Sequence, residues 1–251
     1  MNQGIELGNS SSKAVYDVLE RFPLGAHEIA PTTLDKIEKA YDSPPWWYDI
    51  RGFFILTFSY RSTLGFQIRF FGKNIKENHL EVAVGTGTLF GMILNWRKRK
   101  KMNDTKISAI DYAEPMLAGA RKRFKNNKNI ELLKVDVTRM PFKDNSFSSV
   151  NIANSVHCFP EVDKAFKEIF RVMKPEATFA MNVLLYPRGI WPFKKIAEKI
   201  NNWGMKKGIL YTPYEQEDLK NRITKAGFEV VEEKISGNAY NLLVKKPNTA
   251  K

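Results

Sequence analysis

The most informative stretch of the sequence is a glycine-containing turn between an apolar segment and an amphipathic one. Gly85, Thr86 and Gly87 follow the apolar residues of 80–84 and precede a helix predicted for 88–96. Glycines at such a turn let the backbone approach a ligand closely, and the start of the helix offers unpaired N–H groups. The pattern alone is equally typical of a tight strand-to-helix turn, so it needs support from other positions.

Three further polar residues come directly after predicted strands. They are Asp111, Asp136 and Asn154. An acid after the second strand of a doubly wound sheet accepts hydrogen bonds from ribose hydroxyls, whereas the simpler role for Asp111 is to cap the next helix. Because the carboxyl ends of parallel strands share one edge, we expect these side chains and the glycine turn to converge on one crevice.

The same turn excludes two common nucleotide-binding motifs. A dinucleotide motif requires a third glycine, and Phe90 occupies that position. A P-loop requires Gly-Lys followed by Ser or Thr, which the turn lacks. S-adenosylmethionine is the adenosine-containing cofactor that remains, and we predict it as the ligand.

The elements that must position these residues alternate along the chain. Strands are predicted at 80–84, 107–110, 130–135, 150–153 and 178–184, with helices at 88–96, 115–124 and 162–173 and a further helix starting at 212–215. The alternation predicts an α/β fold with a doubly wound, mostly parallel sheet. Strands at 228–235 and 240–244 predict an antiparallel C-terminal hairpin, which completes a seven-stranded sheet.

Two segments fall outside this alternation. We predict an N-terminal helical arm and lid over 1–75, an α/β domain over 76–251, and an inserted lid helix within 186–213. Four of the five tryptophans lie in the two lid segments, at Trp46, Trp47, Trp191 and Trp203. An aromatic lid suits an apolar or aromatic acceptor, and aromatic residues beside Lys and Arg also suit peripheral contact with an anionic membrane.

Composition narrows the class of protein. The chain has 40 Lys and Arg against 27 Asp and Glu, a net charge of +13, and most of the excess lies within 91–130. These basic residues end predicted helices, at the edge opposite the crevice, so nucleic acid is not the expected acceptor. One cysteine excludes a disulfide scaffold, and no metal site is predicted. Without an apolar run of about 18 residues or a signal peptide, we expect a cytoplasmic chain.

Taken together, these residues resemble class I S-adenosylmethionine-dependent methyltransferases of the small-molecule branch that includes the ubiquinone and menaquinone enzymes. The family motif acid-x-Gly-x-Gly-x-Gly corresponds to Glu81-Val82-Ala83-Val84-Gly85-Thr86-Gly87. The resemblance covers about 41–185 and implies a ribose contact at Asp111 and an adenine contact at Asp136. The cofactor residues it implies are Glu81, Ala83, Gly85, Thr86, Gly87, Asp111, Tyr112, Asp136, Val137, Asn154 and Tyr48.

The chain departs from the family pattern at three places. Ala83 replaces the first glycine of the motif, Ser148 stands where the family usually has Asp, and Glu176-Ala177 replaces a Gly-Gly pair before the fifth strand. A methyl group at Ala83 would crowd the methionine end of the cofactor. Because alanine is the mildest replacement, we still expect an active enzyme.

Methyl transfer from a sulfonium needs mainly orientation and exclusion of water. His157 is the best-placed general base for a phenolic or carbon acceptor, with a structural role in its loop as the alternative. Trp46, Trp47 and Trp191 are the predicted acceptor contacts. Tyr48, Trp46 and Trp47 are candidates to face the sulfonium, with packing of the arm on the sheet as the alternative. Two other functions stay open: an RNA methyltransferase, and a non-catalytic protein that binds S-adenosylmethionine or docks on membranes.

Overall fold

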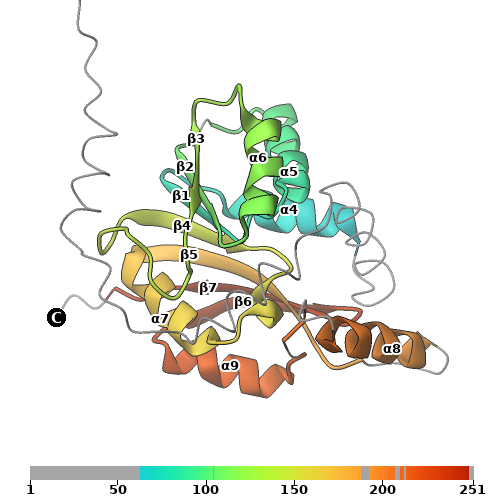
Figure 1. Ribbon diagram of the computed structural model, residues 1–251. Coiled ribbons are helices and arrows are strands. Elements are labelled where there is room, and N and C mark those ends of the chain that lie inside the picture. Colours follow the sequence, from blue (N-terminus) through green and yellow to red (C-terminus); the bar gives the residue numbers. More distant parts are fainter. Residues whose placement is uncertain (1–62, 104, 188–192, 207–209, 212, 249–251) are drawn as a thin grey trace, which may run out of the picture.

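A computed structural model describes residues 63–103, 105–187, 193–206, 210–211 and 213–248 of the chain (Figure 1). Its centre is one seven-stranded sheet in the order β3-β2-β1-β4-β5-β7-β6. The strands are β1 (His79–Val82), β2 (Ile107–Asp111), β3 (Ile130–Lys134), β4 (Phe147–Ile152), β5 (Met173–Leu184), β6 (Glu229–Ser236) and β7 (Ala239–Lys245). The first five strands run parallel, and β7 pairs antiparallel with both β5 and β6. The predicted fold class is therefore confirmed.

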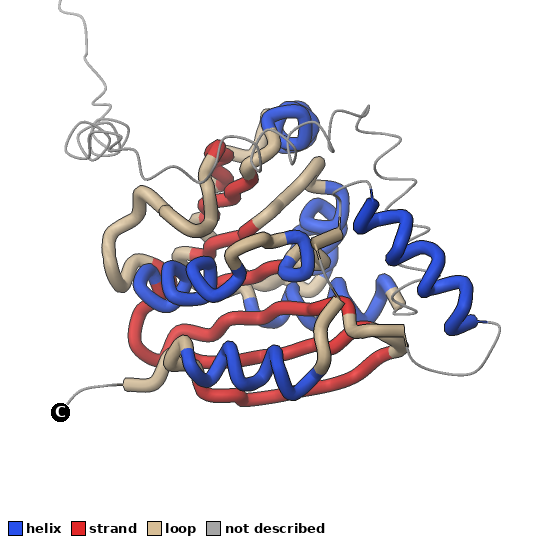
Figure 2. The backbone as a smooth tube through the Cα atoms, turned by 60° about the horizontal axis from the view of Figure 1, so that its bottom comes forward, coloured by secondary structure: helices blue, strands red, loops and turns tan. Residues whose placement is uncertain are grey.

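Helices cover both faces of this sheet (Figure 2). On one face lie α4 (Leu64–Asn74), α5 (Thr88–Arg99) and α6 (Glu114–Phe124), and on the other lie α7 (Val162–Val172) and α9 (Gln216–Lys225). A short 3-10 helix, η2 (Val156–Cys158), follows β4, and α8 (Phe193–Lys206) follows β5. The helix predicted within 186–213 is thus α8, and α4 is the described part of the predicted arm.

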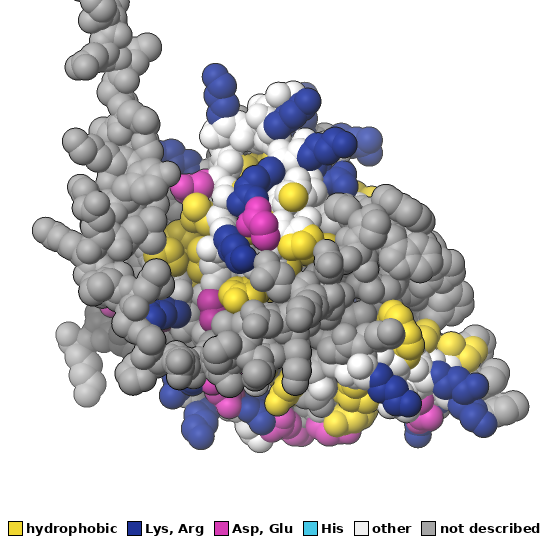
Figure 3. All heavy atoms as spheres, in the orientation of Figure 1, with side chains coloured by type: hydrophobic (Ala, Val, Ile, Leu, Met, Phe, Trp, Pro, Cys, Tyr) yellow, Lys and Arg dark blue, Asp and Glu magenta, His cyan; other side chains and the backbone are white. Residues whose placement is uncertain are grey.

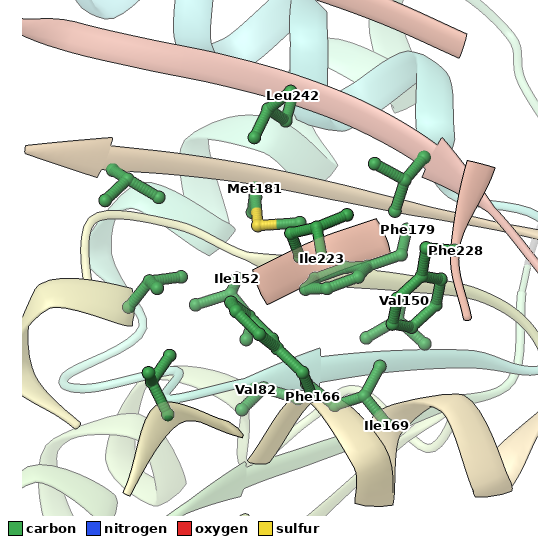
Figure 4. Close-up of a cluster of buried hydrophobic side chains, with 14 of the residues drawn as sticks. Val82, Val150, Ile152, Phe166, Ile169, Phe179, Met181, Ile223, Phe228 and Leu242 are labelled. Atoms are coloured by element: carbon green, nitrogen blue, oxygen red, sulfur yellow. The ribbon is translucent and has the colours of Figure 1, made fainter. Parts of the chain in front are cut away.

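The larger hydrophobic core lies between the sheet and α7 (Figure 4). Phe166 and Ile169 of α7 are fully buried, three residues apart on one face of the helix. The Phe166 ring meets Phe179 of β5 edge-on, with centroids 6.4 Å apart. Burial of each such side chain contributes about 1.5–3 kcal/mol. This core holds the strands in register and so fixes where their carboxyl ends lie.

Several predicted boundaries were wrong by three residues or more, and two of them have a clear local cause. The last parallel strand begins at Met173 rather than 178, because the register shift between Met173 and Thr178 accommodates Pro175. The helix predicted to start at 212–215 begins at Gln216, since Tyr214 forms a parallel bridge with Leu185 and so stays extended.

Candidate cofactor site

The glycine turn joins the end of β1 to the start of α5. Gly85 and Gly87 both have left-handed backbone, with φ of 59° and 74°. A Cβ on Gly87 would lie 2.4 Å from the Phe124 ring, whereas a Cβ on Gly85 would meet none of the described residues within 4 Å. Thr86 between them is buried. The turn therefore has a packed side, toward α6, and an open side over Gly85 from which a ligand can approach.

Asp111, the last residue of β2, holds this turn in place. Its Oδ2 accepts a hydrogen bond of 2.7 Å from the Gly85 N–H, and its Oδ1 accepts one of 3.0 Å from the Ala113 N–H. Burial raises the pKa of the Asp111 carboxyl, and the backbone N–H bonds from Ala113, Gly85 and Tyr112 oppose that rise. The helix-cap alternative is not what the structure shows, because Ala113 is the N-cap of α6. The predicted meeting of Asp111 and the glycine turn is confirmed.

The end of β3 lies beside the end of β2. The Val135 N–H donates to the Asp111 carbonyl oxygen over 3.0 Å, which brings Asp136 and Val137 to the same edge. Asp136 Oδ1 accepts hydrogen bonds from the backbone N–H and the hydroxyl of Thr138, at 2.8 and 2.9 Å. Val137 packs on the larger core. At the end of β2, the Tyr112 ring lies 5.6 Å from Lys134 Nζ.

Asn154, after β4, belongs to a network of side-chain amides. Asn154 and Asn182 of β5 exchange two hydrogen bonds, of 2.6 Å from the Asn154 N–H and 2.7 Å from Asn182 Nδ2. Asn154 Nδ2 also donates to Gln67 of α4 over 3.0 Å. The network therefore ties α4 to the carboxyl ends of β4 and β5. Its described contacts do not include Asp111 or the glycine turn.

Glu81 lies in a polar seam between α4 and the sheet, defined by Asn74, His79, Glu81, Ser149 and Asn151. These five side chains are all buried. His79 bonds through Nδ1 to Ser149 Oγ over 2.8 Å and through Nε2 to Glu81 Oε2 over 3.1 Å. Asn74 Nδ2 donates to Asn151 Oδ1 over 2.9 Å. The described contacts of the Glu81 carboxyl are thus within the seam and not with the turn.

Burial decides the charge state of this seam. It raises the pKa of Glu81 to about 8 and lowers the pKa of His79 to about 3. At neutral pH both groups are therefore uncharged, so that their contact is a hydrogen bond between neutral groups rather than an ion pair. Two residues further on, Ala83 has φ of 55°, the left-handed conformation that a glycine adopts without strain.

His157 lies in η2, on the loop after β4. Only 5% of its side chain is exposed, and burial lowers its pKa to about 3. The Leu184 N–H donates to His157 Nδ1 over 3.5 Å, and the Tyr211 N–H donates to the His157 carbonyl oxygen over 2.9 Å. The residue joins the end of β5 to the segment after α8, which agrees with the structural alternative. Its role as a base stays a prediction.

The basic residues contain one site residue that sequence reasoning missed. Arg123, near the end of α6, donates from Nε to the Thr86 carbonyl oxygen over 3.1 Å and from Nη2 to Thr88 Oγ1 over 2.7 Å. The expectation that 121–128 lies away from the crevice is therefore wrong for Arg123. The missed signal is that long helical side chains point back toward the helix N-terminus. Arg97, in contrast, is buried and donates to the carbonyl oxygens of Gly72 and Ile75.

Four predicted site residues fall outside the described part of the chain. These are Trp46, Trp47, Tyr48 and Trp191. Among the described residues, no helix is long and apolar enough to cross a membrane.

Comparison with known proteins identifies the central part of the chain. Residues 80–181 match a family model described as a methyltransferase domain. The ubiquinone/menaquinone biosynthesis C-methyltransferase UbiE of Rickettsia prowazekii is 35% identical over 111 residues, which are 42% of this chain and 44% of that protein. The chain thus matches less than half the length of this relative.

Solved structures share the fold. A phosphoethanolamine N-methyltransferase of Haemonchus contortus, in complex with S-adenosyl-L-methionine, has a TM-score of 0.63 and 16% identity, and the match covers 90% of this chain and 62% of that one. A SAM-dependent methyltransferase of Aquifex aeolicus has a TM-score of 0.56 and 19% identity, and the match covers 87% of this chain and all of the other. At these identities the likeness shows the fold.

Proposed function

We propose that the chain is an S-adenosylmethionine-dependent methyltransferase, which methylates a small apolar, aromatic or lipid-like acceptor. The observation that carries this proposal is the bond from the Gly85 N–H to the Asp111 carboxylate. It fixes an acid beside a glycine turn at the start of a helix, at the carboxyl edge of a parallel sheet. That is where an open α/β sheet binds a nucleoside.

The residues at this edge fit the cofactor. The open space over Gly85 admits the close approach of a ligand to the backbone. An ionised carboxylate has about four acceptor positions, so Asp111 still has one for a ribose hydroxyl after its bonds to the backbone N–H groups of Gly85, Ala113 and Tyr112. Asp136 lies at the end of the next strand, where it is proposed to contact the adenine. Ala83 lies one residue past β1, on the side of the methionine moiety.

Methyl transfer from S-adenosylmethionine does not require the protein to form a covalent bond with the substrate. When bound, S-adenosylmethionine supplies a methyl group on a positively charged sulfur, which is already activated for displacement by an electron pair of the acceptor. The residues of the chain therefore bind, orient and exclude water, which is where most of the rate enhancement of such a reaction arises. Arg123 and Asp111 contribute by holding the glycine turn from two sides.

His157 is proposed to act mainly by position. With a pKa of about 3, its imidazole stays neutral at pH 7 and is a weak base. Its backbone and ring tie the loop after β4 to Leu184 and Tyr211, next to the carboxyl edge. A weakly basic residue suffices where the acceptor is already ionised or loses its proton to solvent.

Two observations support an apolar acceptor over RNA. Relatives named as C-methyltransferases of ubiquinone and menaquinone biosynthesis match 42% of the chain. Arg97 is buried and bonded to backbone oxygens, so it is not available to a phosphate. Trp46, Trp47 and Trp191 remain the proposed acceptor contacts, and we place the enzyme in the cytoplasm with peripheral contact to the membrane that would hold a lipid-like acceptor.

Transfer of a radiolabelled methyl group tests the proposal. The full chain is incubated with labelled S-adenosylmethionine and, separately, with quinol precursors, small phenols, phospholipid vesicles and RNA. We expect label in an apolar or phenolic product. Transfer to RNA alone would contradict the proposed acceptor, and binding of cofactor without transfer to any acceptor would favour the non-catalytic alternative.

A further inference from the structure

The exposed large hydrophobic side chains of the described residues gather in one segment. Nine such side chains are exposed, and five of them lie between 186 and 211: Tyr186, Ile196, Trp203, Met205 and Tyr211. The segment consists of α8 and the residues on either side of it. In the space-filling view, hydrophobic and Lys or Arg side chains lie together over α8, at the lower right (Figure 3).

The apolar residues form a stripe along α8. Ile196, Ile200 and Trp203 are spaced by four and three residues, so they lie on one side of the helix. Ile196 and Trp203 are 42% and 41% exposed. The buried side is separate, since Ala197 and Asn201 are almost fully buried. The stripe is therefore a second, partly exposed apolar surface, which lies beside the buried side of the helix.

A row of lysines borders the stripe. Lys195 and Lys199 each precede a stripe residue, which places them about 100° further around the helix, and Lys206 continues the same row. All three side chains are exposed. The one acid of the helix, Glu198, lies on another side, where its Oε1 is 3.9 Å from Lys194 Nζ. The apolar stripe and the lysine row together thus form a basic amphipathic surface on α8.

The helix lies at the same edge of the sheet as the cofactor site. It follows β5, whose carboxyl end at Leu184 packs with Leu210 and Ala239 in a small buried cluster. The Leu210 N–H donates to the carbonyl oxygen of Gly204 in α8 over 3.2 Å. The next residue, Tyr211, is bonded to the His157 backbone. These contacts attach α8 to the loop that follows β4.

We propose that α8 is a membrane-docking helix, which inserts the stripe of Ile196, Ile200 and Trp203 into the surface of an anionic lipid bilayer. Its lysine row would lie at the level of the lipid phosphates. Helices of this pattern lie in the interface plane, with binding that scales with buried apolar area and with attraction to anionic lipid. A symmetric pairing of two copies through this surface would bring the two lysine rows together, which disfavours a second copy as the occupant.

The biological role of this docking, delivery of a lipid-like acceptor, rests on the proposed function, whereas the docking itself does not. With α8 in the interface, the carboxyl edge of the sheet lies near the membrane, so a lipid-like acceptor could reach the site without crossing water. The surface itself consists of residues of α8 alone. Binding of the chain to lipid and binding of S-adenosylhomocysteine to the chain are therefore measured separately on every variant.

Co-sedimentation of the full chain with vesicles tests the proposal. The vesicles are of phosphatidylcholine alone or with one third phosphatidylglycerol. We expect binding to the anionic vesicles, release in 1 M salt, and little binding to the neutral ones. Each lysine near the surface contributes about 1 kcal/mol, about fivefold in the partition coefficient, so Lys195→Gln/Lys199→Gln should reduce it about 30-fold. Ile196→Gln should also weaken binding, because its side chain no longer inserts.

The matched control is Lys98→Gln/Lys100→Gln. These two lysines are also exposed, at the end of α5, and the double variant removes the same charge. Binding of this variant should fall less than threefold. No sedimentation with anionic vesicles, an equal or larger loss in the control, or self-association that Ile196→Gln abolishes would each overturn the proposal. Unchanged S-adenosylhomocysteine affinity in the α8 variants would show that their folding is intact.

Discussion

Ala83→Gly is expected both to stabilise the protein and to tighten cofactor binding. Ala83 replaces the first glycine of the motif and has φ of 55°. Its Cβ in this left-handed conformation is close to the following carbonyl oxygen, which costs an L-residue about 1–2 kcal/mol. Glycine adopts the same backbone without that cost, although its unfolded chain gains about 0.4–1 kcal/mol of conformational entropy. The net expectation is a gain of about 0.5–1 kcal/mol in the free energy of unfolding.

Glu176→Gly is the matched control. Glu176 also has left-handed backbone, with φ of 61°, at a position where the family has glycine. It lies in the first part of β5, at the opposite edge of the sheet from the glycine turn. It also forms an ion pair of 3.5 Å with Lys245, which is solvent-screened and contributes little to stability. Its replacement should therefore change stability by a similar or smaller amount and leave the cofactor site as it is.

Urea unfolding and titration with S-adenosylhomocysteine separate the two effects. Ala83→Gly should raise the urea midpoint and strengthen S-adenosylhomocysteine binding, whereas Glu176→Gly should leave binding unchanged. A lower midpoint for Ala83→Gly would show that the backbone at this position is not strained. Equal affinity of Ala83→Gly and the wild type would show that the methyl group does not face the cofactor.

Three further substitutions test the packing and charge of the site. Glu81 is protonated in the folded state up to about pH 8 and ionised above about pH 4.5 when unfolded, so its contribution to the free energy of unfolding should fall by about 2 kcal/mol from pH 6.5 to 8. The lowered pKa values of His79 and His157 offset part of this fall, and Glu81→Gln should remove the decline due to Glu81 in pH-dependent urea unfolding. Gly87→Ala should cost about 2–4 kcal/mol in thermal unfolding through left-handed strain and collision with Phe124, and Phe124→Ala should relieve part of that cost. Arg123→Gln should weaken S-adenosylhomocysteine binding about fivefold by loosening the turn, whereas Arg121→Gln, which alters an exposed pair with Glu114, should not.

The parallel sheet and the carboxyl-edge residues were predictable because they depend on local patterns. Short apolar segments that each end in a polar residue, with amphipathic segments between them, indicate parallel strands, and the two closely spaced segments at 228–235 and 240–244 indicate the hairpin. The meeting of Gly85 with Asp111 follows from the topology of such a sheet. The position of a residue at the carboxyl end of its own strand can be inferred without knowledge of the residues that pack against it.

The polar seam was not predictable for the opposite reason. Polar residues that alternate along β1 and β4, such as His79 and Glu81, are typical of a sheet face that meets solvent or ligand. Here α4 covers that face, and Asn74 satisfies Asn151 across 77 positions of sequence. The seam depends on where α4 packs on the sheet, just as the contact of Arg123 depends on where α6 packs beside the glycine turn. Both are set by packing rather than by periodicity.

The most direct test of the account is calorimetric titration of the wild-type chain and of Asp111→Asn with S-adenosylhomocysteine. The two carboxylate oxygens of Asp111 each accept a hydrogen bond from a backbone N–H group. An asparagine side chain has only one acceptor oxygen, so one of these N–H groups loses its partner. We predict binding by the wild type, a loss of about 10- to 100-fold for Asp111→Asn, and no change for Asp144→Asn, an exposed acid paired with Arg171. Failure of the wild type to bind, or equal affinity of wild type and Asp111→Asn, would contradict the assignment of this edge as the cofactor site.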